Sequence, residues 1–467
     1  MPPGNLGFHS LREERACDLR VEGEVPGWLS GSLLRNGPGA FEMGEAAVDH
    51  WFDGLAMLHR FTFGDDGVAY RNRFLRTDAY AAARAGRFDG GFATGEAGLL
   101  ARLKRFLLDD PYDNANVIAD RIGGEYLALT ETPRWVAFDP ETLTTRGHVR
   151  YDGDAPTGQL ACAHLNRDPD GRAVNFETRF GRTNYYHVYE MTDPRNRTPV
   201  ASVPVDEPAY MHSFGLTPNY VVLTEFPFVV DPLDFFKPGT RGPFVQHYEW
   251  KPDRGTRFLV IDRTAGEVVA DPRTDAFFGF HHANAYEDGD VLVVDLETVP
   301  GAASIETLYI DRLRAGDLDV FGGRLERFRV DPAAGTVDRR TVYEGGTALP
   351  TVSPARWCRR HRYVYAQGTE QPVTEWPQRV VKIDVETGRV VEFADGDNHF
   401  GEPLFVPRPG GDAEDDGVVL TVMLDVAAEH SWLVVLDGQS FDERARAAVP
   451  HAIPFDFHGR FFPELVP

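Results

Sequence analysis

The sequence predicts an all-β protein in which short strands form a closed ring of about six to eight sheets. One hairpin turn recurs along the chain: an apolar, β-branched stretch ends at an aspartate, followed by a few turn-forming residues and another strand. The turn returns every 53 to 69 residues, which is the length of one four-stranded propeller blade. Helical periodicity is scarce in the 467 residues, and only Leu99–Leu108 has a helical pattern.

The recurring turn is clearest in stretches such as FLVIDRTAGEVV, RFRVDPAAGTVD and VVKIDVETGRVV. Its aspartates are Asp139, Asp193, Asp262, Asp331, Asp384 and Asp437. Three of the turns carry a late glycine, at Gly266, Gly335 and Gly388, which supplies the positive φ that tight hairpins need. No linker-like segment interrupts the series, which favours one ring over the alternative, a set of β-sandwiches joined by similar turns.

Composition limits the functions to be considered. Hydrophobic residues make up 42% of the chain, and no run of about 18 apolar residues is present, which predicts a soluble globular protein. The net charge of −24 argues against nucleic-acid binding, because phosphate recognition needs a basic face. Only three cysteines occur and no signal peptide is visible at the start, so we expect a reducing, cytoplasmic location.

Four of the fifteen histidines keep step with the repeat. They follow their turn aspartates by 19 to 25 residues and are His164, His212, His281 and His458. Equivalent positions in successive blades lie at equal depth around the axis, so four imidazoles could meet at one metal ion. Neutral imidazoles suit Fe, Cu, Zn, Co or Ni alike, and four unrelated core or loop histidines are the alternative. Glu131 and Glu402 are placed to accept the second ring N–H of such ligands, or else are solvated strand-end glutamates.

Ordered sequence blocks resemble those of the carotenoid cleavage oxygenases nearly from end to end. The blocks are LLRNGPGAFE, HWFDGLAMLHRFTF, YLALTET, CAHLN, MHSFGLTPNYVVLTEFP, FHHANAYEDGD, GEPLFVPRP and IPFDFHGRFFP. The resemblance implies a seven-bladed β-propeller formed by a single domain over residues 1–467. It also implies a lid of helices and loops over one face, from segments at about 80–112 and 226–250.

The same resemblance implies that the four histidines bind Fe(II), with His282 as a neighbour of the site. Glu131 and Glu402 match two of the three glutamates that usually lie behind the ligands. The third position is occupied by Ala348, in GGTALPTVSP. We therefore expect water or a backbone group to orient His281, and iron to bind somewhat more weakly.

The activity implied is cleavage of a conjugated C=C bond of a carotenoid or apocarotenoid by O₂, which gives two aldehydes. YRNRFLRTDAY and neighbouring stretches are closer to the animal-type enzymes, which favours central (15,15′) cleavage to retinal. Thr130 would crowd one metal position. Phe52 and Phe280 match positions near the cavity, where they would line a tunnel for the apolar polyene; plain core packing is the alternative for each.

Three other functions remain open at this point. The same iron could serve redox-neutral isomerisation or hydrolysis of a retinoid ester, and a stilbene-type alkene dioxygenase is a second possibility within the fold. A non-enzymatic binding module with a structural metal is the third. Labelled O₂ separates the first from oxygenation, because label in an aldehyde product requires cleavage by O₂.

One segment of the sequence suggests contact with a membrane. Leu99–Leu108 (LLARLKRFLL) combines leucines and a phenylalanine with Arg102, Lys104 and Arg105 in an otherwise acidic protein. This pattern is typical of a helix that lies among lipid headgroups, which would place the protein at the inner face of the membrane. A lid helix packed on the ring explains the pattern equally well.

Overall fold

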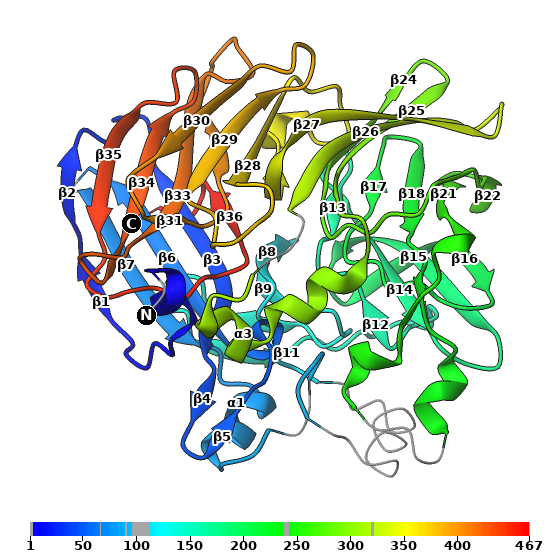
Figure 1. The fold of residues 1–467 in the computed structure, drawn as a ribbon, viewed down its shortest axis with the longest axis horizontal. Coiled ribbons are helices and arrows are strands. Elements are labelled where there is room, and N and C mark those ends of the chain that lie inside the picture. The colour runs from blue at the N-terminus through cyan, green and yellow to red at the C-terminus, as the bar shows by residue number, and fades with distance from the viewer. Residues whose placement is uncertain are drawn as a thin grey trace.

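The structure, a computed structural model, describes residues 3–65, 67–88, 91–95, 112–237, 242–318 and 322–466. The protein is all-β, as predicted, with antiparallel sheets arranged around a common centre (Figure 1). The helix expected at Leu99–Leu108 falls outside the described residues. In the part of the chain that is described, no helix is long and apolar enough to cross a membrane.

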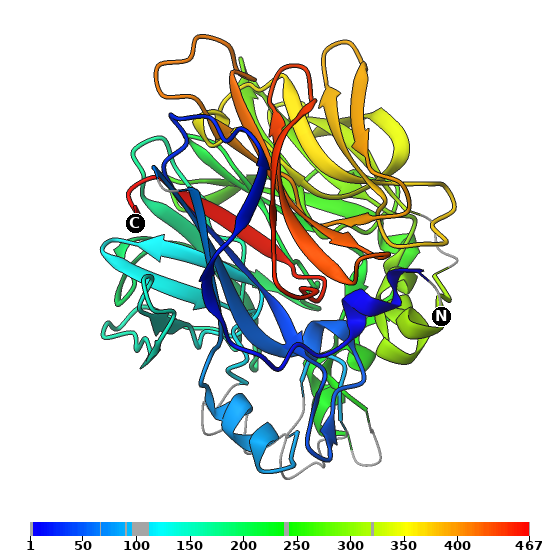
Figure 2. The ribbon, with the colours of Figure 1, turned by 90° about the vertical axis from the view of Figure 1, so that its left-hand side faces the viewer.

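The first sheet joins the two ends of the chain. Its strands, in spatial order, are β1 (Ala16–Asp18), β7 (Gly67–Phe74), β6 (Leu55–Gly64), β3 (Gly31–Ala40) and β36 (His458–Phe462). β36 pairs with β3 from Ser32↔Phe462 to Asn36↔His458, so the last strand completes a sheet begun by the first ones (Figure 2). Hydrogen bonds between these strands hold the first and last parts of the chain together in one sheet.

The next three sheets follow in chain order. The first contains β11 (Thr145–His148), β10 (Val136–Phe138), β9 (Glu125–Leu129) and β8 (Ile118–Ile122). The second contains β12 (Leu160–Ala161), β14 (Ala173–Arg179), β15 (Asn184–Asp193) and β16 (Asn196–Val205), with β13 (Asn166–Arg167) also on β14. The third contains β17 (Gly215–Leu216), β18 (Tyr220–Glu225), β21 (Thr256–Asp262) and β22 (Glu267–Ala270), with β23 (Arg273–Thr274) on β21.

The remaining two large sheets differ in width. The wider one has seven strands: β24 (His282–Asp288), β25 (Val291–Thr298), β26 (Gly323–Asp331), β27 (Thr336–Thr351), β28 (Tyr363–Thr369), β29 (Arg379–Asp384) and β30 (Val390–Ala394). The other contains β2 (Arg20–Gly23), β35 (Glu443–Ala448), β34 (His430–Asp437), β33 (Gly417–Asp425) and β31 (His399–Phe400), with β32 (Leu404–Pro407) on β33. β27 is 16 residues long and pairs with β26 along most of its length and with β28 near its end, which joins two meanders.

All six repeat aspartates lie where the last hairpin of a meander turns. Asp262, for example, ends β21, and its Oδ1 accepts the backbone N–H groups of Thr264 and Ala265, each at 2.8 Å. Gly266 completes this turn at φ +71°, and Gly335 and Gly388 have φ +67° and +73°. An aspartate that accepts N–H groups two and three residues ahead stabilises a tight turn. The predicted hairpins are therefore confirmed.

Short elements lie outside the large sheets. The helices are α1 (Asp78–Arg84) and α3 (Ile310–Ala315). The 3₁₀ helices are η1 (Pro3–Phe8), η2 (Trp51–Asp53), η3 (Pro232–Phe236), η4 (Phe244–His247), η5 (Pro252–Arg254), η6 (Ala302–Leu308) and η7 (Pro354–Arg356). The small strands form the hairpin β4 (Glu42–Met43)–β5 (Ala46–Ala47) and the two-stranded sheet of β19 (Phe228–Val229) and β20 (Glu249–Trp250). α1 and the β4–β5 hairpin lie together at one end of the molecule, at the bottom of Figure 1. η3 and η4 belong to the expected lid segment 226–250, and α1 belongs to the segment 80–112.

Candidate metal centre

Four histidines that are far apart in the chain meet at the centre of the molecule. One ring nitrogen from each lies within 4.8 Å of those of the others. They are His164 between β12 and β13, His212 before β17, His281 directly before β24, and His458, the first residue of β36. β17 and β24 each begin a sheet, and β36 lies at the end of the strand order of the first sheet. The side chains therefore come together from four different sheets, as the repeat phase predicted.

Two of these imidazoles are held by the glutamates singled out in the sequence. His212 donates its Nδ1–H to Glu131 Oε1 at 2.6 Å, and His458 donates its Nδ1–H to Glu402 Oε1 at 2.8 Å. A carboxylate can only accept in such a bond, so Nδ1 carries the proton and the lone pair is on Nε2. Each glutamate thereby fixes one tautomer and one ring orientation.

The expectation for the third imidazole is wrong. His281 Nδ1 lies 3.3 Å from Glu297 Oε2, so a carboxylate and not water or a backbone group is its neighbour. Ala348 lies in β27, and the acid beside His281 comes from another strand: Glu297 belongs to β25. Burial raises the pKa of Glu297 to about 8, against a hydrogen bond from the N–H of Leu349 that lowers it. An acid inside the apolar run VLVVDLETV was the sequence signal for this residue.

The nitrogens that face the centre lie close to one another. His281 Nε2 is buried and has no hydrogen-bond partner among the described residues. His164 Nε2 lies 2.9 Å from His212 Nε2, close enough for the two nitrogens to share a proton or to bind one metal ion together. Burial, with the neighbouring imidazoles adding to it, lowers the pKa of His164 and His281 well below the usual 6.5. Neutral imidazoles with orphaned nitrogens aimed at one point fit a divalent transition-metal ion.

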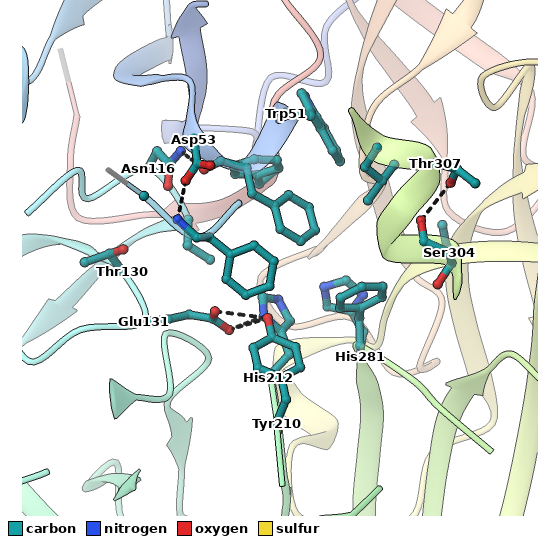
Figure 3. A pocket seen from close by; sticks show the side chains of 18 of the residues that line it. Trp51, Asp53, Asn116, Thr130, Glu131, Tyr210, His212, His281, Ser304 and Thr307 are labelled. Carbon is teal, nitrogen blue, oxygen red and sulfur yellow. Dashed lines mark hydrogen bonds and ion pairs between the residues drawn. The ribbon is translucent and has the colours of Figure 1, made fainter. Parts of the chain in front are cut away.

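Two groups that sequence reasoning missed hold the glutamates in place. Arg35 Nη1 donates to Glu402 Oε2 at 3.0 Å, and its Nε donates to Asp456 at 2.8 Å, with all three side chains buried. The Tyr210 hydroxyl lies 2.9 and 3.0 Å from the two oxygens of Glu131 (Figure 3). Tyr210 precedes a predicted ligand by two residues, which is the one signal that could have pointed to it.

A cavity of about 420 Å³ opens above the histidines, and its walls are mostly apolar. Thr130, Phe52 and Phe280 all line it, together with Glu131, and the Phe52 and Phe280 rings meet edge to face at 5.9 Å. The other aromatic residues of the wall are Trp51, Phe92, Tyr112, Phe180, Tyr210, Phe235, Phe244, Trp376 and Phe457. His282 does not line this cavity; its two ring nitrogens contact Ser213 and Thr224.

Parts of both expected lid segments contribute to the cavity wall. Asp53 accepts the backbone N–H groups of Phe92 at 2.6 Å and Ala93 at 2.9 Å (Figure 3). These bonds tie residues 91–95, here called the lid strip, to the segment that leads into β6 of the first sheet. Burial raises the pKa of Asp53, and the hydrogen bonds from residues 92–94 offset part of that effect. A Cβ at Gly91 would lie 2.2 Å from Asp53 Oδ1, so a residue without a side chain is needed there.

A second cavity, of about 600 Å³, borders the same histidines and has charged walls. His281 and His458 line both cavities, while His164 lines only the charged one. Asp120 in its wall pairs with Arg167 at 2.6 Å and with Arg460 at 3.2 Å. The four imidazoles therefore separate an apolar space from a polar one.

Comparison with known proteins identifies the family. Residues 8–463 match the family described as retinal pigment epithelial membrane protein. The chain is 31% identical to the mitochondrial carotenoid-cleaving dioxygenase of Macaca fascicularis, with 96% of this chain and 92% of that protein covered. It is also 31% identical to the β,β-carotene 15,15′-dioxygenase of Homo sapiens, with coverage of 98% and 94%. The crystal structure of cobalt-substituted Synechocystis apocarotenoid oxygenase matches with a TM-score of 0.86 and 30% identity over 98% of each chain. This chain belongs to the carotenoid oxygenase family.

Proposed function

We propose that the protein is a non-haem Fe(II) dioxygenase that cleaves a conjugated C=C bond of a carotenoid or apocarotenoid with O₂ to give aldehydes. The observation that carries the proposal is the convergence of four imidazoles, three of which line the floor of an apolar, aromatic cavity. The names of the relatives, carotenoid-cleaving dioxygenase and β,β-carotene 15,15′-dioxygenase, support the same activity. The cobalt-substituted relative supports a transition metal at the centre.

His164, His212, His281 and His458 would hold the metal through the nitrogens that face the centre. A ferrous ion bound there would supply the electron transfer that makes O₂ reactive toward an alkene. The chain's own part is to keep the imidazoles aligned. Glu131 and Glu402 do this by accepting Nδ1–H, which fixes the tautomer whose Nε2 lone pair is available to the metal.

The cavity would bind the polyene by excluding water from it. A rigid apolar chain gains about 25 cal/mol for each Å² removed from water, and the aromatic walls offer flat surfaces on both sides. Phe52 and Phe280 would hold one double bond over the metal, and Thr130 would narrow the approach beside Glu131. A water-poor site also protects the reaction from side products.

For the architecture, we infer a ring of seven blades in one domain over residues 1–467. Division of the seven-stranded sheet at β27, which both of its meanders share, raises the six large sheets of the described residues to seven units. The segments at about 80–112 and 226–250 would form the lid, since described parts of both line the cavity. Contact of Leu99–Leu108 with a membrane remains a prediction.

For the bond that is cleaved, central cleavage to retinal is the first choice, supported by the likeness to the 15,15′-dioxygenase. A combined isomerisation is the second, because the carotenoid isomerooxygenase of Galleria mellonella is 31% identical over 95% of this chain. The length of polyene that fits between cavity wall and metal would decide between bonds.

The decisive experiment incubates the Fe(II)-loaded protein with β-carotene, an apocarotenal and a hydroxystilbene under ¹⁸O₂. Products are reduced at once to alcohols, so that label is not lost to water, and are identified by mass. We expect labelled retinal from β-carotene and a shorter labelled aldehyde from the apocarotenal. Products that differ from the substrate only in geometry, or that carry no label, would contradict the proposal and favour redox-neutral chemistry.

A further inference from the structure

Three of the four imidazoles have a carboxylate at Nδ1, but these carboxylates have different origins. Glu131 follows β9 and Glu402 lies between β31 and β32, so each reaches an imidazole that belongs to another sheet. Glu297 is on β25, the strand that pairs with β24, and His281 directly precedes β24. Its backbone N–H also donates to the carbonyl of His281 at 3.0 Å. Glu297 and His281 are therefore fixed relative to each other within one sheet.

The neighbouring strand leaves room for the Glu297 side chain. A Cβ at Gly323 of β26 would lie 2.4 Å from Glu297 Cγ and 2.4 Å from the carbonyl oxygen of Thr347. Gly323 is paired with Thr347 of β27, so the glutamate side chain passes beside a residue that has no side chain. Any side chain at position 323 would displace Glu297 from this path.

β27 supplies a hydrogen-bond donor beside the Glu297 carboxylate. The backbone N–H of Leu349 donates to the Glu297 carboxylate. Leu349 has φ +49°, a left-handed conformation that is uncommon for a leucine, and the register of β27 shifts between Ala348 and Thr351. This irregular backbone lies directly after Ala348, whose methyl group cannot hydrogen-bond an imidazole.

Glu297 is also unusual in its charge environment. It is buried, and among the described residues its one ion-pair partner is His281. By contrast, Glu402 is paired with Arg35, and Glu326 on β26 is paired with Arg339. A buried acid without a cation is costly unless a positive charge lies close by, and a metal ion held by His281 would supply it.

We propose that Glu297 is the positioning residue for His281, in the role that an acid at position 348 would otherwise have. It accepts the Nδ1–H of His281 and so directs Nε2, which is buried without a partner, toward the metal. The inference rests on the proposed metal centre, but not on the identity of the substrate. The metal site then retains three carboxylate-supported imidazoles despite Ala348.

The test measures metal binding in Glu297→Leu, Glu297→Gln and the exchange variant Glu297→Leu/Ala348→Glu. The metal-free protein is titrated with Co²⁺ against a competing chelator, and the visible spectrum of the bound Co²⁺ is recorded. We expect about 10- to 100-fold weaker binding and an altered spectrum for Glu297→Leu, as is typical when the hydrogen-bond partner of a ligand is lost. Glu297→Gln should lose less Co²⁺ affinity, because its amide oxygen can still accept the Nδ1–H of His281. The exchange variant should recover most of the affinity.

Glu326→Gln is the matched control, since it removes a buried acid from the adjacent strand that contacts no histidine. Its Co²⁺ affinity should stay within about twofold of the wild type, well below the loss expected for a ligand partner. If Glu297→Leu binds Co²⁺ like the wild type with an unchanged spectrum, the inference is wrong. Should Glu297→Leu fail to fold, Glu297→Met takes its place, because it keeps the length of the side chain but cannot accept the Nδ1–H; unchanged Co²⁺ affinity and spectrum in that variant lead to the same conclusion. Absence of cleavage by the wild type would contradict the proposed function and leave this comparison intact.

Discussion

The apolar cavity and the charged cavity meet at His281 and His458, which line both, yet their walls are opposite in character. The apolar side is lined by aromatic rings, including Phe52 and Phe280, and is closed by a strip held by Asp53. The charged side contains the Asp120 pairs with Arg167 and Arg460, both built from sheet residues. Low polarity on one side favours a polyene and strengthens electrostatic interactions at the centre. Ion pairs on the other side fix strands that carry the histidines. Substitutions on the two sides should therefore have different effects.

The largest effect is expected at the boundary itself. His458→Ala removes a side chain that lines both cavities, and we expect turnover to fall by at least about 10³-fold, equivalent to about 4 kcal/mol. Metal content, measured by mass spectrometry of the purified protein, should fall with it. His9→Ala, at an exposed histidine, serves as the control and should leave turnover and metal content unchanged. Full metal loading of the His458 variant would show that the four imidazoles do not act as one site.

The next largest effect is expected on the apolar side. Phe52→Ala removes a ring that contacts Phe280, Phe92 and Phe457, so the polyene should lose contact area and about 1–2 kcal/mol of binding. KM for β-carotene should rise about tenfold while metal content stays constant. Phe393→Ala, a half-buried ring on β30 outside the cavity, is the matched control. Loss of metal in the Phe52 variant would contradict a purely substrate-binding role.

A smaller effect on turnover is expected where the lid strip is tied down. Asp53→Ala leaves the N–H groups of Phe92 and Ala93 without their acceptor, at a cost of about 1–3 kcal/mol. Hydrogen exchange should speed up at these two amides before it does so elsewhere, with turnover reduced a few-fold. Asp53→Asn, which retains one oxygen as an acceptor, should have exchange rates and turnover between those of Asp53→Ala and the wild type. Unchanged exchange at both amides would mean that other contacts hold the strip.

The smallest effect on cleavage is expected on the charged side. Asp120→Asn leaves the half-buried Arg167 and Arg460 without their counter-charge, so the free energy of unfolding should fall by about 1–3 kcal/mol. The products formed from β-carotene, identified by mass, should be the same as those of the wild type. A shift in the position of cleavage would show that the charged side also shapes the substrate path.

Local chemistry made much of the architecture predictable. The aspartate turns are set by residues within five positions of one another, so their sequence pattern alone identifies them. The four histidines followed from repetition, because equal phase in successive meanders places residues at equal depth. Glu131 and Glu402 were singled out by their positions and matched by the resemblance, and the structure places both at ring nitrogens.

Contacts that cross strands could not be predicted in this way. Arg35 meets Glu402 and Asp456 from the other end of the chain, and no spacing relates these three residues. Asp53 and the strip at residues 91–95 are joined by side chain and backbone across about forty positions, and no repeat phase relates them. Such pairs depend on how segments distant in the chain pack against one another.

The sequence by itself determined the all-β class, the hairpin turns and the meeting of four imidazoles, because each depends on local propensity or on repetition. Only the tertiary structure decided how His281 is held. Position 348 carries alanine, and the acid beside the ring comes from β25, where Gly323 leaves room for it and the Leu349 N–H offsets part of its burial. The phase of a repeat describes depth along the axis, whereas the course of a side chain depends on the space that its neighbouring strands leave.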